Sequence, residues 1–190
     1  MDLLVLPGSN SKTLAWAENV ISPFKSRFEE IRFHEYGMWK TGTTAFDIKA
    51  ELEAVKIWAN GRKNLMIFGK SVGSWLAVQS IQFEILNPQL SFFVGVPLGK
   101  ETRSKVAPQE LFHKISAPVV IIQGDKDPIC PAAELKVLLD EGYSGNWKFF
   151  EVQDNDHWYN RIEDIQKIMA KCFEEFDKGE LFAGLSVSEK

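Results

Sequence analysis

The sequence predicts an α/β fold: a single-domain three-layer sandwich with helices on both faces of a mostly parallel sheet of about six strands. Three observations support this prediction. Short apolar runs rich in β-branched and aromatic residues alternate along the whole chain with segments of helical periodicity. The 190 residues, 45% of them hydrophobic, are enough for one sizeable core. No internal repeat, low-complexity tract or linker divides the chain.

The first half of the chain starts with a short apolar run, which is followed by a segment of helical character. Further on, Ile48, Leu52, Val55 and Ala59 recur at helical spacing, which indicates an amphipathic helix ending at Gly61. Proline breaks helices, because its ring clashes with the preceding turn and it lacks an N–H donor. We therefore predict strands within residues 3–6, 27–36 and 64–69, and helices over residues 13–24 (as far as Pro23) and 47–60.

The second half continues the alternation. A segment with few polar residues runs from Val72 to Leu86 and should be stopped by Asn87 and Pro88. We predict strands at 91–96, 118–124 and 146–154, a helix at 131–140, and a final helix with the apolar stripe Ile162, Ile165, Met169, Cys172, Phe173 and Phe176. The domain should span residues 1–180, and residues 181–190 should form a loose C-terminal tail.

Composition argues against several classes of partner. The 22 basic and 26 acidic residues give a net charge of −4 without a basic block, so nucleic acid is not an expected partner. The N-terminus lacks the features of a signal peptide, and no segment approaches the roughly 18 apolar residues of a membrane helix. Only Cys130 and Cys172 are present, which predicts inert packing thiols and a cytoplasmic protein with no membrane association.

Polar residues follow four of the predicted strands. Gly8, Ser9 and Asn10 come after the first, Ser71 after the third, Gly124 to Asp127 after the fifth and Asn155 to His157 after the last. The carboxyl ends of parallel strands meet at one edge of the sheet, where ligands bind. A hydroxyl, a carboxylate and an imidazole are therefore expected at this edge, in the chain order Ser, Asp, His, which is one of the known orders for a catalytic triad.

These motifs resemble the α/β-hydrolase family, in particular its small members without a large lid. The resemblance spans nearly the whole chain and rests on Gly69-Lys70-Ser71-Val72-Gly73, on Gly124 to Asp127 with Pro131 behind it, and on His157. It implies a serine esterase or thioesterase that works through an acyl-serine intermediate, with no cofactor and no metal. Only residues 97–117 occupy the place where relatives carry a lid, so a large cap is not expected.

The residues themselves support the roles that the resemblance implies for Ser71 and His157. Ser71 lies between a predicted strand and a predicted helix, where side chains at Gly69 or Gly73 would clash with backbone. A serine needs a base in hydrogen-bond reach to become a nucleophile. Of the three histidines, His34 falls inside a strand-like run and His113 before a strand. Only His157 is at the carboxyl edge.

The orienting acid is expected to be Asp127 rather than Asp125, because Asp127 stands three residues past Gly124, where the family's acid turn places it. Asp154 and Asp156 are closer to His157 in sequence, but such near neighbours rarely face Nδ1. Many relatives have glycine immediately before the histidine, whereas this chain has Asp156. Whether Asp156 modifies or replaces the role of Asp127 stays open.

The resemblance also implies an oxyanion hole and a binding site. The amide of Val72 should provide one oxyanion donor, and the amide of Ser9 the other, with Asn10 as the second choice. The segments 36–46 and 97–108 should frame an open site for a small-molecule substrate. Its apolar walls are expected to be Met38, Trp39, Leu98, Trp75 and Trp158.

Two other functions compete with the hydrolase. The loop "LPGSNSKTLA" (residues 6–15) resembles the phosphate loop of flavodoxin-like NADPH-dependent FMN reductases, where a Gly-Ser and a later Ser or Thr bind the FMN phosphate. A hydrolase fold can also serve as a non-catalytic binding module, because fold does not fix function. A metal hydrolase is weaker still, since no close His and Cys or paired carboxylate spacing occurs. The natural substrate and the oligomeric state stay open.

Overall fold

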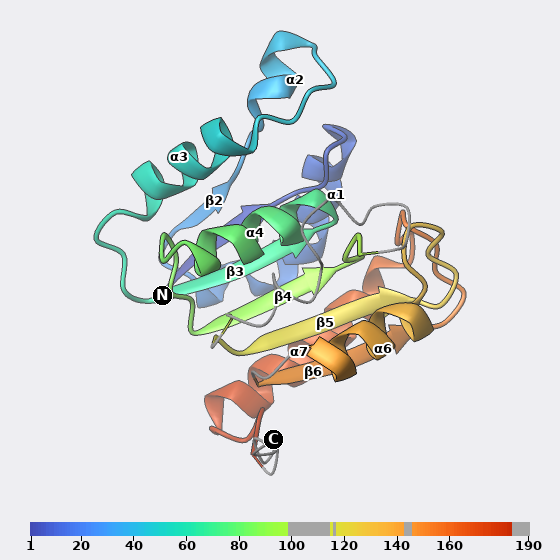
Figure 1. Cartoon of the computed structure of the whole chain (residues 1–190). Helices are drawn as coiled ribbons and strands as arrows, with labels where there is room; N and C mark the ends of the chain where they lie inside the picture. Colours follow the sequence, from blue (N-terminus) through green and yellow to red (C-terminus); the bar gives the residue numbers. More distant parts are fainter. Residues whose placement is uncertain (99–114, 116, 143–145, 184–190) are drawn as a thin grey trace.

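The computed structural model describes residues 1–98, 115, 117–142 and 146–183. Among these, six strands form one sheet in the order β2-β1-β3-β4-β5-β6 (Figure 1). Every neighbouring pair of strands is parallel, which confirms the predicted fold class and strand number. The strands are β1 (Asp2–Leu6), β2 (Ile31–Phe33), β3 (Leu65–Lys70), β4 (Leu90–Val94), β5 (Val119–Gly124) and β6 (Trp147–Val152).

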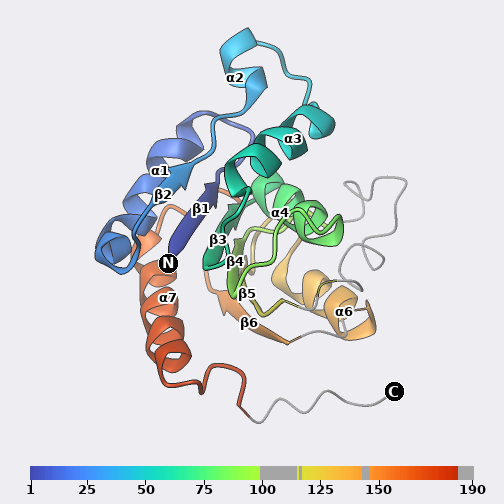
Figure 2. The ribbon, with the colours of Figure 1, turned by 90° about the vertical axis from the view of Figure 1, so that its left-hand side faces the viewer.

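Helices cover both faces of the sheet (Figures 1 and 2). On one face, α3, α4 and α6 enclose a cluster of buried side chains that includes Val55, Leu76 and Leu135. On the other face, α1, η1 and α7 enclose a second cluster that includes Val20 and Phe173. The helices are α1 (Lys12–Ile21), the 3₁₀ helix η1 (Ser22–Arg27), α2 (Gly37–Thr41), α3 (Ile48–Ala59), α4 (Val72–Gln82), α6 (Ala132–Gly142) and α7 (Ile162–Asp177).

The ends of two helices differ from the prediction. The first α-helix stops at Ile21, and the chain then continues through Pro23 as the 3₁₀ helix η1, because proline is tolerated in the first turn of a helix. Helix α4 ends at Gln82, not at Leu86. Glu84 adopts the left-handed φ of 57°, and the amide of Ile85 donates to the carbonyl of Ser80, which closes the helix before the proline is reached.

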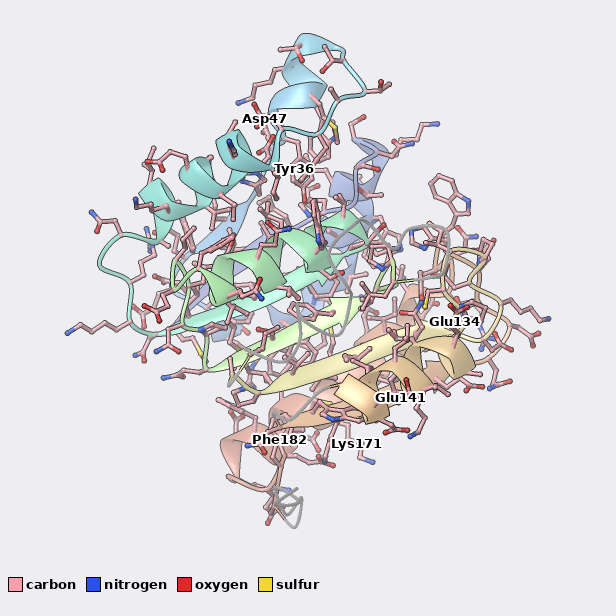
Figure 3. All side chains as sticks on the ribbon, viewed as in Figure 1. Tyr36, Asp47, Glu134, Glu141, Lys171 and Phe182 are labelled. Carbon is pink, nitrogen blue, oxygen red and sulfur yellow. The ribbon has the colours of Figure 1, made fainter. Side chains whose placement is uncertain are left out.

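The short helix α2 was not predicted, since five residues are too few to show a periodicity. Gly42, with φ of 68°, ends it. Tyr36 precedes α2, is fully buried, and donates its hydroxyl proton to the carbonyl of Pro7 at 2.6 Å (Figure 3). Asp47, also labelled there, accepts the amides of Lys49 and Ala50 and so starts α3. This region therefore braces the loop that follows β1.

The strand order fixes where a site can form. The chain runs from β1 to β2 in one direction across the sheet, and β3 then returns to the other side of β1. In such sheets the connections on the two sides of the switch leave a crevice at the carboxyl ends of the strands. The loop after β1 and the turn after β3 therefore face each other at this crevice.

The last described residues pack against the buried cluster on the face of the sheet that α1 and α7 cover. Leu181 is 2% exposed and belongs to the second buried cluster, so the packed region continues past the predicted boundary at residue 180. Residues 184–190 of the predicted tail lie outside the described part. Among the described residues, no helix combines the length and apolar character required to cross a membrane.

Candidate active site

Ser71 stands on a sharp turn between β3 and α4. Its φ of 52° and ψ of −120° are values that residues other than glycine rarely adopt, so the turn holds Ser71 under backbone strain. The flanking glycines allow this close packing. A Cβ at Gly73 would lie 1.9 Å from the carbonyl oxygen of Leu6, and a Cβ at Gly69 2.8 Å from Cα of Ser74. Both glycines are therefore required by contacts with neighbouring backbone.

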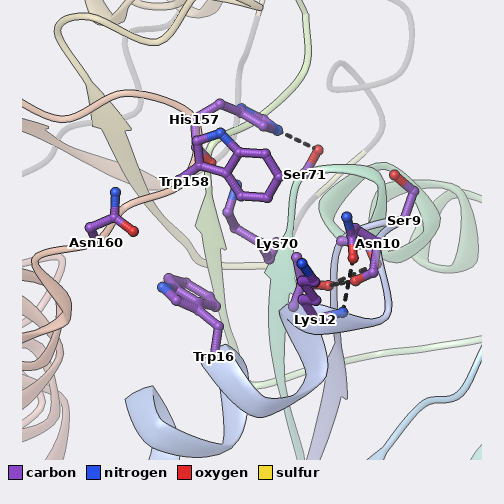
Figure 4. A pocket seen from close by; sticks show the side chains of 11 residues that line it. Ser9, Asn10, Lys12, Trp16, Lys70, Ser71, His157, Trp158 and Asn160 are labelled. Atoms are coloured by element: carbon purple, nitrogen blue, oxygen red, sulfur yellow. Dashed lines mark hydrogen bonds between the residues drawn. The ribbon is translucent and has the colours of Figure 1, made fainter.

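The structure brings Ser71, His157 and Asp127 together. The Oγ of Ser71 lies 2.8 Å from Nε2 of His157 (Figure 4). Nδ1 of His157 lies 2.8 Å from Oδ2 of Asp127. The other nearby carboxylates have different partners: Oδ1 of Asp125 accepts the amide of Asn155, Asp154 pairs with Lys126, and Oδ1 of Asp156 accepts the amide of Trp158.

Asp127 is fully buried and held by several donors. Its Oδ2 accepts the hydroxyl of Tyr159 at 3.1 Å, and its Oδ1 accepts the amide of Ile129 at 3.0 Å. Burial by itself would raise the pKa of Asp127, but the hydrogen bond and charge interaction with His157, the Ile129 amide and the charge of Lys70 lower it below its usual value. Asp127 is therefore an anion that faces the imidazole.

Tyr159 links the loop bearing His157 to the turn bearing Asp127. Its hydroxyl donates to Asp127 and accepts the amide of Gly124 at 2.8 Å, and burial raises the pKa of this phenol. Its carbonyl accepts the indole N–H of Trp16 at 3.0 Å, which ties the loop to α1. Tyr159 carries no signal in the sequence, because its role depends on contacts between distant segments.

A cavity of about 270 Å³ opens beside Ser71 (Figure 4). The predicted oxyanion residues Ser9 and Asn10 line it, and Val72 is the first residue of α4, whose early amides have no acceptor within the helix. Trp39 donates its indole N–H to the carbonyl of Ser9 at 2.7 Å and so positions that loop. The lining comprises Gly8, Ser9, Asn10, Lys12, Thr13, Trp16, Lys70, Ser71, His157, Trp158 and Asn160.

Of the five predicted wall residues, Trp158 lines this cavity and is 56% exposed. The other four are not among the residues that line this cavity. Met38 and Leu98 are buried in the cluster under α3 and α4, and Trp39 and Trp75 pack against that cluster. Most of the predicted frame 97–108 lies outside the described residues, as does His113.

His34, the remaining histidine, is buried away from this cavity. Its Nε2 lies 2.7 Å from Oε2 of Glu51, and burial lowers the pKa of His34 despite the neighbouring carboxylate. Within the described ranges, no three His, Cys, Asp or Glu side chains gather as a metal ion would need. In the loop that resembles a flavin phosphate loop, the hydroxyl of Thr13 donates to backbone carbonyls of Gly8 and Asn10.

The chain is similar to known proteins both in its sequence family and in its fold. A family model described as "Alpha/beta hydrolase domain" matches residues 44–176. No curated protein sequence matches the chain. Among solved structures, MGS-MChE2, an alpha/beta hydrolase enzyme from the metagenome of lagoon sediments at Mar Chica, Morocco, has a TM-score of 0.75 at 16% identity, over 93% of this chain and 92% of that one.

Two further solved structures are similar in fold. The type II thioesterase BorB from the borrelidin biosynthetic cluster has a TM-score of 0.66 at 15% identity, covering 90% of this chain and 89% of its own. Est1E from Butyrivibrio proteoclasticus, solved with bound ferulic acid, has a TM-score of 0.71 at 14% identity, covering 92% of this chain and 88% of its own. At such identities the likeness concerns the fold alone.

Proposed function

The chain belongs to the α/β-hydrolase domain family, and from this membership we propose that it is a serine hydrolase of carboxylic esters or thioesters. The observation that carries the proposal is the unbroken line of hydrogen bonds from Ser71 through His157 to Asp127. This line ends at a cavity large enough for a small acyl or aryl group. Family membership supports hydrolysis, and the line supports serine as the nucleophile.

In the first half of the reaction, His157 accepts the hydroxyl proton of Ser71 through Nε2 while Oγ attacks the carbonyl carbon of the substrate. Asp127 accepts the hydrogen bond from Nδ1–H of His157, which fixes the tautomer of His157, and its negative charge stabilises the imidazolium that forms. The imidazolium then returns its proton to the leaving alcohol or thiol. The product of this half is an acyl-Ser71 ester.

In the second half, a water molecule gives a proton to His157 and attacks the acyl-Ser71 carbonyl. The tetrahedral species collapses, and His157 protonates Oγ of Ser71, which frees the carboxylic acid. Both halves build up negative charge on the carbonyl oxygen. We assign its stabilisation to the amides of Val72 and Ser9, with Asn10 as the alternative; one such donor contributes on the order of 3 kcal/mol in the transition state.

Substrate class rests on the cavity and on the neighbours in fold. The indoles of Trp16 and Trp158 and the loop after β1 line a site that suits an apolar acyl or aryl group. BorB is a thioesterase, and Est1E was solved with ferulic acid, so both ester and thioester substrates are reasonable first choices for this chain.

The test uses a fluorophosphonate probe and a short p-nitrophenyl ester. The wild-type protein should be labelled covalently and should hydrolyse the ester. Ser71→Ala should abolish both while leaving the circular dichroism spectrum unchanged, because Oγ is the attacking atom. Ser22→Ala, at a serine in η1, serves as the matched control and should behave like the wild type.

Two results would contradict the proposal. Labelling or turnover that persists in Ser71→Ala would remove Ser71 from the role of nucleophile. If the wild-type protein is neither labelled nor active on ester and thioester panels, the fold serves as a binding module instead.

A further inference from the structure

Lys70 is a buried lysine next to the candidate nucleophile. It is the last residue of β3, immediately before Ser71, and only 2% of its surface is exposed. Side chains alternate between the two faces of a strand, and Lys70 points to the same face as Phe68, toward α1 and α7. The other residues of β3 are apolar or glycine. A charged residue at this point of the strand calls for a specific reason.

The surroundings of Lys70 direct its ammonium group to the loop that bears His157. Nζ donates to the carbonyl oxygen of His157 at 2.9 Å. It lies 4.7 Å from the ring centre of Tyr159 and 6.0 Å from that of Trp16. Gly95 leaves the space that Nζ occupies, because a Cβ there would lie 2.7 Å from it. The site therefore has the shape of a socket for this ammonium group.

The loop between β6 and α7 needs such an anchor. Asp154 and Tyr159 both adopt left-handed φ values, 56° and 53°, so the backbone bends on either side of His157. The flanks are tied down: the amide of Asn155 donates to Asp125, and the carbonyl of Tyr159 accepts from Trp16. Lys70 bonds the carbonyl of His157 itself, in the middle of the loop.

We propose that Lys70 is a positioning residue. By its hydrogen bond to the backbone carbonyl of His157, it holds His157 at hydrogen-bond distance from Ser71. The inference rests on the proposed serine hydrolase function. Because Lys70 and Ser71 are consecutive, one strand end carries both the nucleophile and the support for its base. Movement of the His157 backbone relative to this strand end is thereby restricted, so the 2.8 Å separation of Oγ and Nε2 is maintained.

The hydrogen bond from Lys70 to the carbonyl of His157 depends on an N–H donor and not on charge alone. Burial lowers the pKa of Lys70 to about 7, against the opposing effect of the Asp127 and Asp156 charges. Both the ammonium and the neutral amine carry N–H groups, so the bond to His157 persists in either state. Methionine, an unbranched side chain only slightly shorter than lysine, has no N–H donor, so it removes this hydrogen bond and fills most of the same volume.

The experiment compares Lys70→Met with Lys126→Met and the wild type. Lys126 donates to Asp154 in the same loop, but both side chains are exposed, so its removal should leave kcat within about twofold. Lys70→Met should lower kcat for a short p-nitrophenyl ester by roughly 10- to 100-fold, since a displacement of about 1 Å in a reacting group has effects of that size. KM should change by less than about threefold, because Lys70 is one of eleven residues that line the cavity and methionine fills most of its volume.

A second measurement follows His157 directly. The Nδ1 proton of the hydrogen bond from His157 to Asp127 should give a far-downfield ¹H NMR resonance in the wild type and in Lys126→Met. Loss or broadening of this resonance in Lys70→Met, in a protein with an intact circular dichroism spectrum, supports positioning. This measurement needs no turnover, so it tests whether Lys70 positions His157 even if the ester proves not to be a substrate.

Two outcomes overturn the inference while leaving the proposed function standing. Wild-type kcat in Lys70→Met would show that the bond to His157 has no effect on the reaction. A lowered kcat with an unchanged His157 resonance would show that Lys70 acts by some other route. If Lys70→Met does not fold, Lys70→Leu, which also lacks an N–H donor, should give the same losses.

Discussion

At the scale of single residues, Asp127 owes its role to the groups around it. It is one of four carboxylates near His157, together with Asp125, Asp154 and Asp156, and all four are in loops that follow β5 or β6. Of these four, Asp127 is the one whose carboxylate lies within hydrogen-bond distance of Nδ1, and it is fully buried. Burial makes its charge effective, because little solvent screens it from the imidazole.

Asp127→Asn should reduce kcat on the order of 10³- to 10⁴-fold with little change in KM. The amide either loses the acceptor for the Nδ1 proton or presents its NH₂ group to it, and both results favour the wrong tautomer of His157. Steady-state kinetics on the p-nitrophenyl ester measure the effect. Asp125→Asn keeps the oxygen that accepts the Asn155 amide and serves as control; a loss there equal to that in Asp127→Asn would contradict the assignment.

The sequence was informative about Ser71, Asp127 and His157 because each follows a strand, and the ends of parallel strands meet at one edge. Lys70 and Tyr159 could not be assigned in this way. The contribution of Tyr159 depends on a hydroxyl that reaches Asp127 from a loop 32 residues further along the chain. For Lys70 a signal did exist, since a lysine in an otherwise apolar buried strand is unusual.

At the scale of elements, the turn from β3 into α4 combines strain with function. Ser71 has a left-handed φ that glycine adopts freely and other residues adopt at a cost of about 1 to 3 kcal/mol. The first residues of α4 follow at once, so the helix amides point toward the place where Oγ is presented. The same strained backbone conformation that lowers stability also presents the hydroxyl of Ser71 to His157.

Ser71→Gly should be more stable than Ser71→Ala by about 1 kcal/mol. Glycine removes the backbone strain at this turn, and the greater conformational entropy of glycine in the unfolded chain offsets only part of that stabilisation. Both variants lose the hydrogen bond to His157, so their difference isolates the backbone. Thermal unfolding should show a higher Tm for Ser71→Gly by roughly 2 to 4 °C. The pair Ser74→Gly and Ser74→Ala is the control: Ser74 lies inside α4, and glycine should be the less stable of the two. A Ser71→Gly variant no more stable than Ser71→Ala would mean that the turn is unstrained.

The local sequence of each strand and helix explains which elements were predicted well. The six strands of the described residues were all predicted, because most of them are apolar runs between recognisable turns. The end of α4 was missed because it depends on Glu84 in a left-handed conformation, which nothing in the local sequence requires. Met38 and Leu98, which were expected to line the site, are buried in the cluster under α3 and α4, and Trp75 packs against it. Apolar residues near a site cannot be sorted into wall and core without the third dimension.

At the scale of the whole molecule, the site joins two sides of the sheet. The loop after β1 and the turn after β3 meet at the switch in strand order, and the loop after β6 reaches across to them through His157. The socket of Lys70 is at this junction, between the central strand β3 and the layer of α1 and α7. Its buried charge should therefore affect the stability of the entire fold.

The sign of this effect follows from the two pKa values of Lys70. In the folded protein burial lowers the pKa to about 7, whereas in the unfolded chain it stays near 10.5. Between these values the unfolded chain binds one proton more than the folded protein, so the free energy of unfolding rises with pH, by about 1.4 kcal/mol per unit. Below pH 7 the amine is charged in both states and the destabilisation is complete. Above about pH 10.5 it is gone.

Lys70→Met should consequently unfold at higher urea concentration than the wild type at pH 6, with a gain on the order of 4 kcal/mol after allowance for the lost bond to His157. The gain should shrink steadily as the pH is raised from 7 to 9.5, because the wild type recovers stability as Lys70 loses its proton. Urea unfolding at a series of pH values measures the difference in the free energy of unfolding between Lys70→Met and the wild type. Lys126→Met, which removes an exposed charge, is the control, and its free energy of unfolding should stay close to that of the wild type at every pH. A difference for Lys70→Met that does not vary with pH would mean that Lys70 titrates as an ordinary lysine. The predicted result, a variant that is more stable and less active, would identify Lys70 as a group whose burial weakens the fold while it supports the reaction at Ser71.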